Sequence, residues 1–102
     1  MNLQELIATL EKHDPAKTVR MGFSDPHSYR GDYSELAFEP KEHTTVGAML
    51  VAARSALGAT FQGYKGGDYR MDEWTHCWLA KYGCSGETIG PILLGFMLGE
   101  YP

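Results

Sequence analysis

The sequence predicts an α+β fold, in which a small antiparallel sheet of about four strands packs with three helices in a single domain. Three observations support this prediction. Helical and strand periodicities both occur along the chain. The length of 102 residues fits one domain, with an expected radius of gyration of about 13 Å. The composition, 43% hydrophobic and 22% charged, is that of a globular protein and argues against disorder.

The first segment predicts a helix over residues 3–10, because leucine and isoleucine recur there at i, i+3, i+4 and i+7. Asn2 is placed to cap this helix, and Glu5 completes the pattern of a capping box. The helix should end before Pro15, since a residue that precedes proline avoids the helical region.

Residues 17–23 alternate between apolar and polar side chains, which predicts a strand with one buried face. That face comprises Val19, Met21 and Phe23. Residues 24–32 are rich in turn formers and predict a loop. Residues 33–39 alternate again, so we expect a second strand antiparallel to the first.

The middle of the chain predicts a helix that is capped by Thr44 or Thr45 and ends at Gly58. Residues 59–63 and 69–71 are short strand candidates around a glycine turn. Residues 73–80 carry large side chains on both alternating faces. This pattern indicates a central strand covered on both sides, with a helix as the competing interpretation.

The last element is predicted to be a helix over residues 89–98. Thr88 is its expected N-cap, and Pro91 would lie in its first turn, where the missing N–H costs little. Its expected core side comprises Ile89, Leu93 and Phe96.

Charge and composition exclude several classes of partner. The net charge of −4 is unfavourable for a long nucleic acid, because Lys and Arg supply most of the affinity for phosphates. The apolar run at residues 89–98 is much shorter than the roughly 20 residues that span a bilayer, and the N-terminus lacks the features of a signal peptide. Two cysteines make a disulfide framework improbable, so we expect reduced thiols and a cytoplasmic protein.

A first candidate site lies at residues 26–31, where imidazole, hydroxyl, phenol and guanidinium groups follow one another. Its predicted ligand-binding residues are His27, Ser28, Tyr29 and Arg30. Arg30 is suited to a bidentate pair with phosphate or carboxylate, and Tyr29 to stacking on a ring. The alternative is a hairpin loop that satisfies its own polar groups, with Arg30 paired to Asp32 or Glu35.

A second candidate site lies in the glycine-rich stretch of residues 63–69. Its predicted ligand-binding residues are Tyr64, Lys65, Gly66 and Gly67. Successive glycine amides can form an anion-binding concavity, to which Lys65 adds charge. The spacing matches neither a P-loop nor a dinucleotide fingerprint, and the alternative is a plain β-turn.

Known motifs of enzyme active sites and metal sites fit this sequence poorly. The histidines and cysteines show no C-x-x-C or H-x-x-x-H spacing, so we expect no metal or cofactor and name no catalytic residue. A small hydrolase or lyase that uses His27 and a carboxylate such as Glu39 remains the enzymatic alternative.

Three segments carry a family resemblance: GFSDPHSYRGDYSELAFEP, TVGAMLVAARSALGATFQGYKGGDYRM and GCSGETIGPILLGFML. In this order they resemble a family of small, mostly uncharacterised proteins of tailed phages and prophages, and the likeness runs from Val19 to Leu98. The chain departs from that pattern at residues 75–78 and at Cys84. The resemblance implies a phage origin and a setting in the host cytoplasm.

These observations lead to one functional hypothesis with an alternative. We expect a phage-encoded binding protein that sequesters a small anionic, phosphorylated or nucleotide-like ligand and so counters host defence. We also expect a homo-oligomer, because a small sheet has edges that need covering. The alternative is a protein–protein inhibitor of a host enzyme that needs no small ligand.

Overall fold

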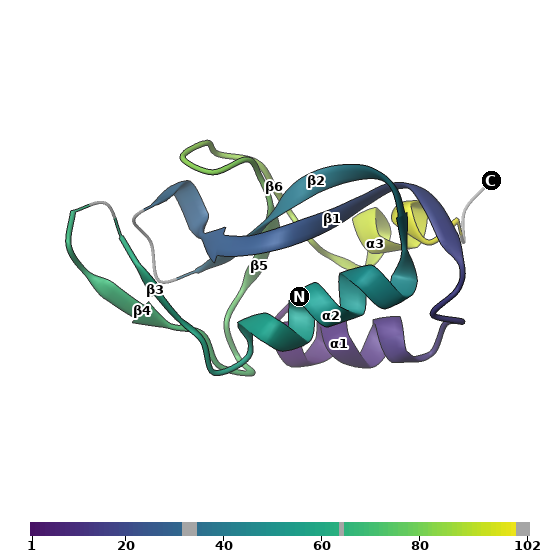
Figure 1. Ribbon diagram of the computed structural model, residues 1–102, viewed down its shortest axis with the longest axis horizontal. Coiled ribbons are helices and arrows are strands. Elements are labelled where there is room, and N and C mark those ends of the chain that lie inside the picture. The colour runs from purple at the N-terminus through teal and green to yellow at the C-terminus, as the bar shows by residue number, and fades with distance from the viewer. Residues whose placement is uncertain (32–34, 64, 100–102) are drawn as a thin grey trace.

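The computed structural model describes residues 1–31, 35–63 and 65–99. Within these ranges the chain is an α+β protein with a radius of gyration of 12.7 Å (Figure 1). The helices are α1 (Leu3–Glu11), α2 (Val46–Ala56) and α3 (Pro91–Met97), with a short 3-10 turn, η1 (Tyr29–Gly31). The strands are β1 (Thr18–Ser28), β2 (Leu36–Thr45), β3 (Thr60–Gln62), β4 (Asp68–Arg70), β5 (Cys77–Leu79) and β6 (Glu87–Thr88).

The main sheet has the strand order β1-β2-β5-β6, and β3 and β4 form a separate hairpin. The fold class and the central position of β5 are confirmed, and the helical alternative for residues 73–80 is wrong. The sheet is mixed, however, because β5 runs parallel to β2 with Leu36 opposite Cys77 and Phe38 opposite Leu79. The other pairings, β1–β2 and β5–β6, are antiparallel.

Strand β1 is longer than predicted, since it includes residues 24–28, which the turn-forming composition assigned to a loop. The register of β1 against β2 shifts by one residue at a bulge around Asp25, whose φ is 33°. Pro26 is tolerated because β1 is an edge strand, where a missing N–H breaks no ladder. Pro40 is accommodated likewise, because the β2–β5 pairing ends at Phe38 and only β1 flanks β2 there.

The helices cover one face of the sheet, with α1 and α2 side by side beneath the β1–β2 ribbon (Figure 1). Both predicted caps are present: Asn2 and Glu5 form a capping box, and the Thr45 hydroxyl accepts from the Ala48 N–H. The main hydrophobic core draws on all three helices and on the sheet. It includes Leu3, Leu6 and Leu10 of α1, Met49 and Ala53 of α2, Phe23 and Phe38 of the sheet, and Leu94 of α3.

The C-terminal helix departs from its prediction. It begins at Pro91 with Gly90 as N-cap, because Thr88 belongs to β6 and its hydroxyl bonds the His76 ring instead. The core side of the helix also differs from the prediction. Leu94 and Met97 are buried, whereas Phe96, which is predicted to face the core, is 60% exposed.

None of the helices in the described ranges combines the length and the apolar content that crossing a bilayer requires.

Candidate functional site

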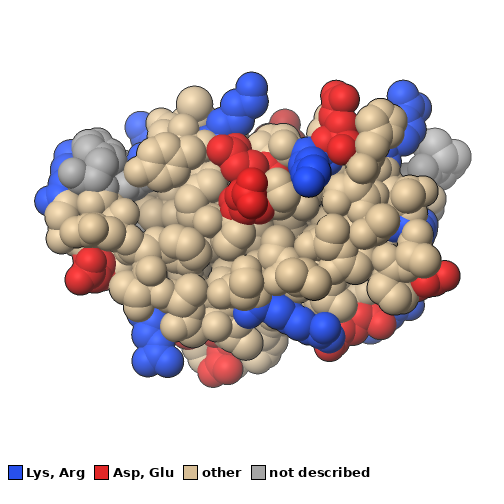
Figure 2. All heavy atoms as spheres, in the orientation of Figure 1, with Lys and Arg blue, Asp and Glu red and all other residues tan. Residues whose placement is uncertain are grey.

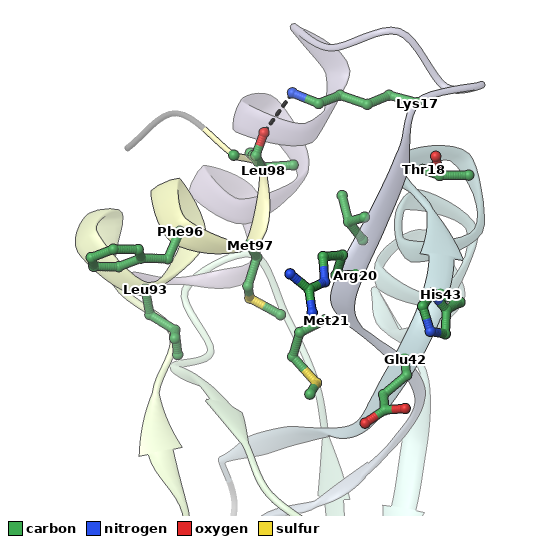
Figure 3. Close-up of a pocket in the computed structure, with 12 residues that line it drawn as sticks. Lys17, Thr18, Arg20, Met21, Glu42, His43, Leu93, Phe96, Met97 and Leu98 are labelled. Atoms are coloured by element: carbon green, nitrogen blue, oxygen red, sulfur yellow. Dashed lines mark hydrogen bonds between the residues drawn. The ribbon is translucent and has the colours of Figure 1, made fainter. Parts of the chain in front are cut away.

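A cavity of about 570 Å³ lies between β1 and α3 (Figure 3). It has the size of a typical small-molecule site, about 300–1,000 Å³. Its walls are partly apolar, from Met21 of β1 and from Leu93, Phe96 and Met97 of α3. Its polar lining comes from Lys17, Thr18 and Arg20 and from Glu42 and His43.

Arg20 is the group most suited to binding a ligand in this cavity. Its side chain is exposed and extends from β1 toward α3 (Figure 3). In the described part of the chain, no side-chain hydrogen bond or ion pair satisfies its guanidinium group. Glu42 and His43 at the cavity border are likewise exposed and unpaired among the described residues. The lining of this cavity therefore combines a cation and a hydrogen-bond acceptor with an apolar wall.

Two further features occur in the lining of this cavity. The Lys17 ammonium group donates to the carbonyl oxygen of Leu98, which ties the start of β1 to the end of α3 and places a positive charge there. His43 adopts a φ of 52°, which few residues other than glycine accept at no cost. Such outliers are concentrated at functional sites.

The first predicted site is mostly enclosed. The rings of Tyr29 and Trp78 stack with their centroids 4.2 Å apart and their planes 7° apart, and the Tyr29 hydroxyl accepts from the Gly86 N–H. Ser28 and Tyr29 are buried, whereas Arg30 is exposed with a φ of 57°. The outer sheet face thus has a small aromatic cluster where the sequence predicted ligand contacts, and the ligand-binding role of these residues stays a prediction.

The second predicted site forms the turn between β3 and β4. Gly66 donates its N–H to the Gly63 carbonyl oxygen at 2.9 Å, so this amide is committed to the turn. Gly67 lies against the Tyr69 ring, Lys65 is exposed, and Tyr64 falls outside the described residues. Strand β3 contacts β1, and the hairpin lies at the same end of the molecule as η1 (Figure 1).

The enzymatic alternative needs His27 and Glu39, which the fold brings together. Their nearest atoms, Nε2 and Oε1, are 4.0 Å apart. Both ring nitrogens of His27 also lie about 3 Å from carbonyl oxygens, Nδ1 at 3.0 Å from Ser28 and Nε2 at 3.1 Å from Ala80. Glu39 accepts from the Tyr82 N–H, and His27 is only 9% exposed. The pair therefore links β1 to the segment after β5, which favours a structural role over catalysis.

Neither the charged side chains of the face shown in Figure 2 nor the potential metal ligands among the described residues identify a further site. Acidic and basic side chains are interspersed over this face, with no continuous basic stripe on it. Among the described residues, no three His, Cys, Asp or Glu side chains converge to hold a metal ion.

Sequence reasoning missed the β1–α3 cavity. The alternation of Met21 with Val19 and Phe23 predicts a core position, yet Met21 is 44% exposed and lines this cavity. Comparison of the chain with protein-family models, curated proteins and solved structures found no match.

Proposed function

We propose that this protein is a binding protein that captures a small anionic, nucleotide-like ligand in the cavity between β1 and α3. The observation that carries the proposal is the Arg20 guanidinium group, which extends toward α3 with no side-chain partner among the described residues. A guanidinium binds phosphate or carboxylate through two parallel hydrogen bonds. In the host cytoplasm that the phage resemblance implies, such capture would withdraw a nucleotide signal from host defence.

The remaining lining supports this class of ligand. Met21 and Met97 offer adaptable thioether surface to a flat apolar ring. The Glu42 carboxylate accepts hydrogen bonds from N–H groups, such as those of a nucleobase. Lys17 adds a second positive charge at one end of the cavity. Together these groups match a ligand with an anionic group, an apolar ring and N–H donors.

Isothermal titration calorimetry against cyclic and linear nucleotides, with inorganic phosphate alongside, tests the function. We expect at least one nucleotide to bind and Arg20→Ala to weaken that binding by about tenfold to a hundredfold, the usual effect of losing a charged hydrogen bond. Arg70→Ala is the matched control, because Arg70 is an exposed strand arginine outside the cavity lining. Its affinity should equal that of the wild type.

Two outcomes would count against this assignment. Absence of binding across the panel would remove the capture function. If Arg30→Asn abolishes binding while Arg20→Ala does not, the ligand lies at the η1 turn instead. Asparagine is chosen at position 30 because it tolerates the left-handed backbone found there.

A further inference from the structure

The charged side chains that line the cavity between β1 and α3 limit the charge of the ligand it can hold. Among the described lining residues, Lys17 and Arg20 carry positive charges and Glu42 carries a negative one. With His43 counted as neutral, the lining has one net positive charge. These charges act on a bound ligand with little screening, because the Debye length is about 8 Å at physiological ionic strength. The lining therefore matches a ligand with a single negative charge.

Lys17 has less of its charge available for a ligand than Arg20 does. The Lys17 ammonium group donates to the carbonyl oxygen of Leu98 at the C-terminal end of α3. Carbonyl groups at the C-terminus of a helix carry partial negative charge, which offsets part of the charge of a nearby cation. Arg20 has no side-chain partner among the described residues. One cation is thus available to pair with an anionic group of the ligand.

Glu42 lies where it would repel a second negative charge on that ligand. In the antiparallel register of β1 and β2 it is directly opposite Met21, and such pairs have Cβ atoms about 4.5–5.5 Å apart. Met21 follows Arg20 in the chain, and all three residues line the cavity. The Glu42 side chain is exposed and has no ion-pair partner in the described part of the chain. Its carboxylate is therefore free to act on an anion that Arg20 holds.

We propose that this cavity selects a ligand with one negative charge and that Glu42 is the residue that rejects multiply charged phosphates, an inference that rests on the capture function proposed above. The ligand class is a nucleoside phosphodiester, in which the phosphate carries one charge. A nucleoside 5′-monophosphate carries close to two charges at neutral pH, because a phosphate monoester loses its second proton near pH 6. The second charge would lose hydration without gaining a cation, and it would also face Glu42. The net charge of −4 on the whole chain acts in the same direction.

Three phosphates of one nucleoside separate the charge of the ligand from its shape. The 3′,5′-cyclic monophosphate and the 5′-methyl phosphate ester each carry one negative charge, whereas the 5′-monophosphate carries close to two. Isothermal titration calorimetry at pH 7.5 measures the dissociation constants of this series for adenosine, guanosine, cytidine and uridine. For a base that binds, we expect both phosphodiesters to bind at least about tenfold more tightly than the 5′-monophosphate.

Glu42→Gln tests the residue to which the selectivity is assigned. The substitution removes the negative charge and keeps the size of the side chain, so the preference for the phosphodiesters should fall by about threefold to tenfold. Glu73→Gln is the matched control, because Glu73 is an exposed carboxylate outside the lining of this cavity. It changes the net charge of the chain by the same amount, and its preference should equal that of the wild type. Circular dichroism melting checks that both variants fold.

Four outcomes would overturn the selectivity. Equal affinity for the three phosphates would do so and would leave the capture function standing. Binding of the cyclic nucleotide without the methyl ester would show that shape, and not charge, is selected. An unchanged preference in Glu42→Gln would remove the role of Glu42. Absence of binding across the whole series would remove the capture function as well, so failure of the selectivity alone is distinguishable from failure of the proposed function.

Discussion

The Cys77 thiol shows how burial sets the chemistry of a single residue. Cys77 lies in the core with no exposed surface, and burial raises the pKa of its thiol from 9.0 to about 12. In the unfolded chain the same thiol ionises near its ordinary pKa of 9.0. Ionisation of this thiol therefore favours the unfolded state. The contribution of Cys77 to the free energy of unfolding is complete below pH 9 and is lost as the pH rises toward 12.

We expect the free energy of unfolding to fall more steeply above pH 9 in the wild type than in Cys77→Ala. The difference between the two slopes should approach about 1.4 kcal/mol per pH unit, the value for one proton. Urea denaturation at pH 8, 9, 10 and 11 measures it. Subtracting the variant removes the contribution of other groups that titrate in the same range. Parallel slopes would show that Cys77 ionises equally well in the folded protein.

Aromatic and polar residues at positions 27–29 show why residue type alone does not identify a site. The sequence gives His27 and Tyr29 the chemistry of ligand contacts, and the fold places them against carbonyl oxygens and against Trp78. Ligand binding and packing within the fold require the same types of side chain. Which of the two roles His27 and Tyr29 take depends on Trp78, Ala80 and Gly86, which are distant in sequence and adjacent in space.

At the scale of elements, the start of α1 is determined by local sequence. The Asn2 side chain accepts from the Glu5 N–H at 2.9 Å, and the Glu5 carboxylate accepts from the Asn2 N–H at 2.9 Å. Asn2→Ala should lower the free energy of unfolding by about 1 kcal/mol, because it leaves an amide at the helix terminus unsatisfied. Urea denaturation measures this. Gln4→Ala, an exposed change in the same turn, should stay within about 0.5 kcal/mol of the wild type.

The strands depend more on their neighbours than the helices do. Residues 24–28 have the composition of a loop, yet they complete β1 because pairing with β2 supplies their backbone partners. The β2–β5 pairing also lies outside local sequence, since a parallel pair joins segments that are separated by a long connection. Sheet order therefore could not be predicted from alternation alone.

At the scale of the whole molecule, local stability should differ between the two sheets. The main sheet packs on the helical core, whereas β3 and β4 form a two-stranded hairpin of three residues each. Isolated two-stranded hairpins are marginal in water. We therefore expect the amides of Phe38 and Leu79 to exchange with deuterium at least about a hundredfold more slowly than the paired amides of the hairpin. Hydrogen exchange followed by NMR measures both, and equal protection would show that the hairpin opens only with the core.

Local sequence predicts the α+β class, the three helices with the caps of α1 and α2, and the approximate place of most strands. These features depend on periodicity and on hydrogen bonds within a few residues, so the chain carries them locally. The parallel β2–β5 pairing, the exposure of Phe96 and the cavity beside Arg20 instead follow from the packing of the elements. Each of these depends on which distant segments meet, because burial is a property of the packed elements and not of the residues taken one at a time.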